Sequence, residues 1–144
     1  MATGIAYFFG LSARLMEFFL VRMRGEVGVA FSMPGGDASG TAGTRPVDLA
    51  HLARQTMGDR ELEREVLAMF VHQSLSVRDQ ISDADARQRV LLAHGLKGSA
   101  RGIGAFAVAD CAAVIESQPD DTRALKKLST LIEEVRDFIA GINR

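Results

Sequence analysis

The residues best suited to chemistry lie in the short run 94–105, which reads HGLKGSARGIGA. A neutral imidazole nitrogen, such as one of His94, is a competent nucleophile toward phosphorus. On a helix, Lys97 and Arg101 would share a face with His94, because residues three, four and seven apart lie above one another. Cations beside the imidazole can neutralise charge on a phosphoryl group during its transfer. The run therefore predicts an exposed histidine that accepts a phosphoryl group.

Glycine is unusually frequent around this histidine. Each glycine inside a helix costs about 1 kcal/mol relative to alanine, so the run needs a compensating role in packing or function. Gly98 follows His94 by one helical turn, where a side chain would crowd the imidazole. We therefore expect Gly98, together with Gly95, to keep the ring open to a partner protein.

The sequence carries no signature of an enzyme that would bind a nucleotide itself. It has no G-x-x-x-x-G-K-[ST] loop and no kinase-type glycine-rich loop. No acidic cluster suggests a Mg²⁺ site, and the histidines are too far apart in sequence for a helical metal clamp. We expect no cofactor and no metal, with Mg²⁺ required only in the partner. The chain would be a phosphoryl carrier without kinase activity of its own.

The elements that must position these residues read as helices from residue 46 to the end. Apolar residues recur at helical spacing, and the period-two alternation of strands is missing. The expected helices span 47–57, 59–81, 85–103, 106–118 and 122 to the end. Short connections make neighbouring helices antiparallel. The predicted fold class is all-α, an antiparallel up-down-up-down four-helix bundle with a short additional N-terminal helix.

The last helix has the clearest apolar seam. Its expected core positions are Leu125, Leu128, Ile132, Val135, Ile139 and Ile142.

Motif and helix order together resemble the histidine-containing phosphotransfer (HPt) domain family. Its H-x-L-K-G-S/A signature is matched by residues 94–99, and the further glycine by Gly104. The resemblance covers about residues 46–144. It implies that His94 is phosphorylated, that Lys97 assists electrostatically and that Gly98 leaves room for a docking protein. It also implies a phosphorelay role, with receiver domains of a hybrid histidine kinase and of a response regulator as partners.

Position 116 departs from many members of that family, which have a polar residue there, often an amide. In an antiparallel hairpin that turns near residue 105, residues 94 and 116 are equally far from the turn, so Glu116 should face His94. A carboxylate can accept a hydrogen bond from the ring and fix its tautomer. It would also repel an incoming phosphoryl group. Our hypothesis is orientation by Glu116, and the sequence leaves open whether the carboxylate helps or hinders transfer.

Residues 1–33 differ from the rest of the chain and are rich in phenylalanine. The longest uncharged stretch, 1–13, is too short for a transmembrane helix. Two interpretations stay open: an amphipathic helix on a membrane or partner, or a non-native segment with the true start at Met33. The glycine-rich stretch 34–45 is predicted to be a flexible linker. Residues 46–144 would form the HPt bundle.

Composition excludes several other classes of protein. The net charge of −1 and pI near 6.3 argue against binding to nucleic acid or to an anionic membrane. The only cysteine, Cys111, excludes an intramolecular disulfide and is expected to be a small core residue. His51 and His72 are expected to be bystanders at single surface positions on helices. We expect a cytoplasmic monomer.

Two other functions stay open at this point. One is a helical-bundle module that binds receiver or kinase domains without carrying phosphate. The weaker one is a membrane-surface adaptor anchored by residues 1–31.

Overall fold

The computed structural model describes residues 45–142, and all its regular elements are α-helices. Residues 1–44, and with them the predicted apolar segment and nearly all of the predicted linker, lie outside the described residues. The described part contains five helices and no strand, as expected for an all-α chain. They are α4 (Leu49–Gln55), α5 (Arg60–Ile81), α6 (Ala86–Ile103), α7 (Phe106–Ser117) and α8 (Thr122–Ile142).

Aspartate side chains begin most of these helices. Asp59 accepts a hydrogen bond from the Leu62 backbone N–H at 3.0 Å, and Asp85 accepts one from Gln88 at 2.8 Å. Each satisfies a donor that the first helical turn leaves unpaired. Both starts agree with the sequence analysis. The start of α4 does not, because Asp48 is its N-cap and the helix begins two residues later than predicted.

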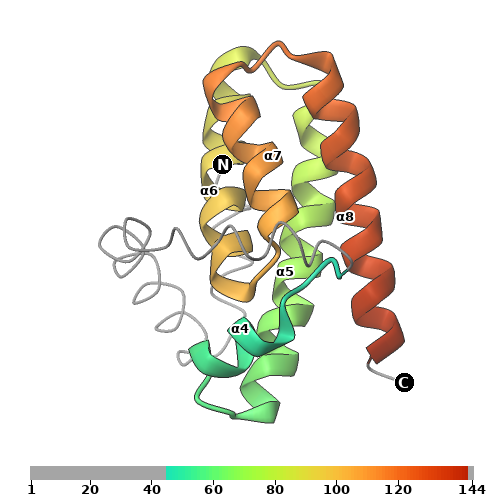
Figure 1. Ribbon diagram of the computed structural model, residues 1–144. Helices are drawn as coiled ribbons and strands as arrows, with labels where there is room; N and C mark the ends of the chain where they lie inside the picture. The colour runs from blue at the N-terminus through green and yellow to red at the C-terminus, as the bar shows by residue number, and fades with distance from the viewer. Residues whose placement is uncertain (1–44, 143–144) are drawn as a thin grey trace.

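The four long helices pack around one apolar core. In Figure 1 the α5–α6 and α7–α8 connections lie at one end of the molecule and the α6–α7 turn at the other. Each long helix packs on the next, and α8 also packs on α5. The largest fully buried side chains include Phe70, Leu96, Ile115 and Leu128, so every long helix contributes to the core.

The predicted seam of α8 is correct in its middle and wrong at its end. Leu128, Ile132, Val135 and Ile139 are buried, whereas Ile142 in the last turn is 42% exposed. Near the start of the helix Ala124 is buried as well. The seam therefore ends before the helix does.

The short helix α4 lies across the end of α6. The backbone N–H of Asp48 donates to the carbonyl of Gly104 at 2.9 Å. The ring of His51 donates through Nε2 to the carbonyl of Arg101 at 3.0 Å and stands edge-on to Phe106. His51, which we expect to be a bystander and not a nucleophile, is half-buried, and its ring joins α4 to the last turn of the helix that carries His94.

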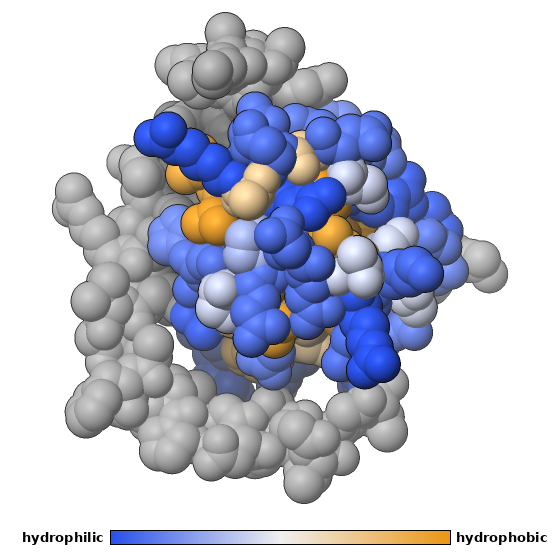
Figure 2. Space-filling model, turned by 90° about the horizontal axis from the view of Figure 1, so that it is seen from above, coloured by the Kyte–Doolittle hydropathy of each residue, from blue (hydrophilic) through white to orange (hydrophobic). Residues whose placement is uncertain are grey.

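The opposite end of the molecule is held by Arg89. Its guanidinium donates to the carbonyls of Ile81, Ser82 and Pro119 at 2.9, 2.7 and 3.0 Å. These carbonyls lie at the last residue of α5, in the α5–α6 connection and in the α7–α8 connection, so one side chain links the two connections. Seen from above, this end is mostly hydrophilic, with small apolar patches between the polar side chains (Figure 2).

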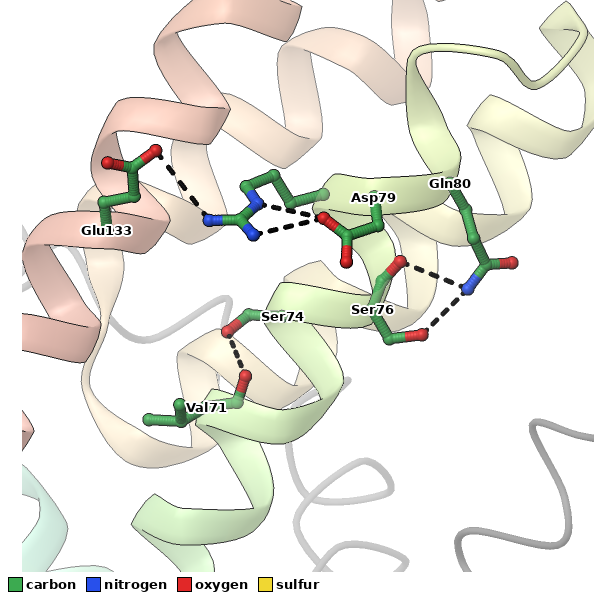
Figure 3. Close-up of polar contacts among 7 residues, drawn as sticks. Val71, Ser74, Ser76, Asp79, Gln80 and Glu133 are labelled. Carbon is green, nitrogen blue, oxygen red and sulfur yellow. Dashed lines mark hydrogen bonds and ion pairs between the residues drawn. The ribbon is translucent and has the colours of Figure 1, made fainter.

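A looser polar contact joins α5 to α8. The guanidinium of Arg78 lies 3.1 Å from Asp79 Oδ1 and 3.8 Å from Glu133 Oε2. Figure 3 labels Asp79 and Glu133 and marks these interactions with dashed lines. Within residues 45–142, no helix is long and apolar enough to cross a membrane.

Candidate functional site

The site is built on the middle of α6. The side chain of His94 is 62% exposed, while Leu96 and Ser99 on the same helix are buried. The helix therefore turns its apolar face inward and leaves the imidazole at the surface, as the sequence spacing indicates. Burial of the ring would have ruled out direct transfer to another protein, and the ring is not buried.

Glu116, from the neighbouring helix α7, is hydrogen-bonded to the imidazole. Its Oε2 lies 2.6 Å from His94 Nδ1. Because a carboxylate oxygen only accepts, Nδ1 carries the proton in this contact. In the neutral ring the other nitrogen, Nε2, then has a free lone pair. The contact thus selects the tautomer whose outer nitrogen can act as a nucleophile.

Lys97 binds the other oxygen of the same carboxylate. Its Nζ lies 2.5 Å from Glu116 Oε1. The hydrogen bond from Lys97 lowers the pKa of the Glu116 carboxyl below its ordinary value, and the hydrogen bond from His94 acts in the same direction. The carboxylate is therefore held in its charged form between a lysine and a histidine. The sequence placed Lys97 beside the phosphoryl group and did not suggest this pairing.

The glycines near His94 differ in their surroundings. A Cβ added to Gly95 would meet no atom within 4 Å, so packing does not require glycine there. Gly98 is half-buried one turn after His94. At the end of α6, Gly104 has a φ of 92°, in the left-handed region that favours glycine.

The remaining candidates lie further from this cluster. Arg101 is half-buried two turns after His94, and within residues 45–142 its guanidinium makes no hydrogen bond or ion pair. Cys111 is buried, and its thiol donates to the carbonyl of Ala124 at 3.2 Å. Burial raises the pKa of this thiol. Among the described residues, no group of three metal-binding side chains is placed to hold a metal ion.

The comparison with protein families matches more than half of the chain. The model of the Hpt domain matches residues 48–138, from the N-cap of α4 to the last turns of α8. The chain belongs to the Hpt domain family. Hpt domains are phosphotransfer modules of two-component signalling. No curated protein and no solved structure matches the chain.

The Hpt match starts at Asp48, so it includes α4 as well as the four long helices. The short helix is thus part of the family's pattern and also of the contacts that hold the end of α6. The match does not reach residues 1–47.

Proposed function

We propose that this Hpt domain is a phosphocarrier that shuttles a phosphoryl group between receiver-domain aspartates through a phosphohistidine at His94. One observation carries the proposal: an imidazole that is 62% exposed and whose Nδ1 is bound to a carboxylate 2.6 Å away. An exposed ring can reach an atom of another protein, and a fixed tautomer presents one reactive nitrogen.

The reacting atom is Nε2. It attacks the phosphorus of an aspartyl phosphate, so that a P–N bond forms while the P–O bond to the aspartate breaks. The aspartate leaves as a carboxylate. Nδ1 keeps its proton, and the ring therefore gains positive charge as Nε2 bonds to phosphorus. Transfer to the next aspartate reverses these steps. Mg²⁺ and the acidic residues that bind it belong to the receiver domain, and the carrier needs no cofactor.

Glu116 favours this reaction on electrostatic grounds. Its Oε2 lies 2.6 Å from the nitrogen that keeps its proton, so it stabilises the positive charge that develops on the ring. Repulsion of the phosphoryl group is reduced because Lys97 binds the other oxygen at 2.5 Å. We therefore propose that Glu116 assists transfer. Arg101, on the same face of α6, is proposed to attract the phosphoryl group.

Partner access is proposed to run over the outer face of α6. Gly95 and Gly98 bear no side chains there, and Leu91, one turn before His94, is 67% exposed. A receiver domain can approach this face closely. We expect the interface to be small and the complex to be transient, since a relay partner must leave. We propose that the four long helices form an antiparallel up-down-up-down bundle. We also propose that the protein is a monomer and is located in the cytoplasm.

Transfer from a phosphorylated receiver domain tests the proposal. We expect label on the chain that is labile in acid and stable in base, and we expect His94→Gln to abolish it. Unchanged labelling of that variant would show that a residue other than His94 is phosphorylated. Binding of the receiver without any labelling would instead indicate a module that recognises receivers and carries no phosphate.

A further inference from the structure

The charged end of Lys97 is already bound within the site. Its Nζ lies 2.5 Å from one oxygen of Glu116, whose other oxygen lies 2.6 Å from His94 Nδ1. The Lys97 side chain is 21% exposed, against 62% for His94, so it does not stand out beside the ring. We propose that Lys97 is a positioning residue that acts on His94 through the Glu116 carboxylate and does not contact the phosphoryl group. The inference rests on the proposed phosphocarrier function.

The physical reason lies in how a carboxylate is oriented. The last torsion of a glutamate side chain has a broad energy profile, so a carboxylate with one partner can turn and offer either oxygen to it. An ammonium on Oε1 forms a charge-assisted hydrogen bond that restricts this motion. With Lys97 in place, Oε2 of Glu116 stays aimed at Nδ1 of His94. Without Lys97, the carboxylate keeps its charge and loses this restraint.

Arg101 provides a matched control on the same helix face. Within residues 45–142 its guanidinium has no hydrogen bond or ion pair, so it is not paired with Glu116. Replacing Arg101 removes a cation near the arriving phosphoryl group and leaves the carboxylate untouched. Lys97→Met and Arg101→Met therefore each remove one positive charge from the same face of α6. Only Lys97→Met also removes a hydrogen-bond partner of the Glu116 carboxylate.

A double-mutant cycle distinguishes an effect that acts through Glu116 from a direct effect on the phosphoryl group. The measured quantity is the rate of phosphoryl transfer from a phosphorylated receiver. Lys97→Met should slow transfer about tenfold in the wild-type background and less than about twofold in a Glu116→Gln background. Arg101→Met should slow transfer by the same factor in both. Lys97→Arg should restore most of the rate, because a guanidinium can also donate to Oε1. Equal slowing by Lys97→Met in both backgrounds would mean that Lys97 acts on the phosphoryl group directly, and would overturn the inference.

A second measurement needs no phosphoryl donor. ¹⁵N NMR of the unphosphorylated protein, at a pH where its imidazoles are neutral, reports the fraction of His94 with the proton on Nδ1. Lys97→Met should reduce this fraction, and Arg101→Met should leave it unchanged. An unchanged fraction in Lys97→Met would overturn the inference even if His94 is labelled. Absence of labelling in the wild type would contradict the phosphocarrier function, while the NMR result would still decide the role of Lys97.

Discussion

The backbone of Asp48 lies directly against Gly104. The Asp48 N–H donates to the Gly104 carbonyl at 2.9 Å, and a Cβ on Gly104 would lie 2.8 Å from the Asp48 carbonyl oxygen. Gly104 also has a φ of 92°. Gly104→Ala therefore meets both backbone strain and a clash with backbone. We expect it to lower the free energy of unfolding by about 2–4 kcal/mol, measured by urea denaturation.

Gly95→Ala is the control for this prediction. Gly95 is helical, and a Cβ there would meet no atom within 4 Å. Alanine in an open helical position should raise the free energy of unfolding by about 0.5–1 kcal/mol. A similar loss of stability in both variants would show that the contact with Asp48 is not the cause.

Arg89 should matter more for stability than a surface arginine normally does. It is 17% exposed and donates to the carbonyls of Ile81, Ser82 and Pro119. We expect Arg89→Met to lower the free energy of unfolding by about 1.5–3 kcal/mol in urea denaturation.

Arg78→Met is the matched comparison for Arg89→Met. Arg78 is paired with Asp79, which is 67% exposed, and lies 3.8 Å from Glu133. Ion pairs in such exposed positions contribute little, so the expected loss is below about 1 kcal/mol. If Arg78→Met costs as much as Arg89→Met, the three carbonyl contacts of Arg89 are not the source of its effect.

Glu116 should make stability depend on pH in a defined direction. The hydrogen bonds from Lys97 and His94 lower the pKa of its carboxyl in the folded protein. A lowered pKa gives a contribution that is present above the unfolded value, about 4.3, and is lost as pH falls through the folded value. The difference in free energy of unfolding between wild type and Glu116→Gln should therefore shrink at acidic pH. Urea titrations over a pH series measure it, and a difference that does not change with pH would contradict the assignment.

Cys111 should be chemically inert in the folded protein. Burial raises the pKa of its thiol, and the thiol donates to the carbonyl of Ala124. The thiolate is the reactive form, so alkylation by iodoacetamide should be at least about tenfold slower in the native protein than in denaturant. Mass spectrometry over time measures both rates. Equal rates would place the thiol at the surface.

Much of this arrangement could be predicted from the sequence because local signals agree with tertiary packing. Asp59 and Asp85 precede apolar periodic stretches and do cap their helices. Equal distances from the turn near residue 105 place Glu116 opposite His94, and the structure brings the two side chains together. Helical hairpins with short turns have a nearly fixed register, so residues that face each other across the two helices can be predicted from the sequence.

Contacts that depend on side-chain conformation were not predictable in the same way. Lys97 can point outward or across to α7, and only the packed structure shows that it binds Glu116. His51 reaches a carbonyl fifty residues away, and no local pattern marks that partner. Its position in a short helix gave the only indication, which favoured a surface role. The predicted start of the first helix at residue 47 is earlier than the one that Asp48 provides.

The reactive ring and its carboxylate come from consecutive helices joined by the shortest connection between long helices in the described chain, at Gly104 and Ala105. Their spacing is set inside one helical hairpin, without direct contributions from α5 or α8. Substitutions on the outer surfaces of those two helices should therefore leave the spacing between the ring and its carboxylate unchanged. The pair that carries the chemistry can thus stay constant while the sequences of the two helices that do not contribute to it diverge.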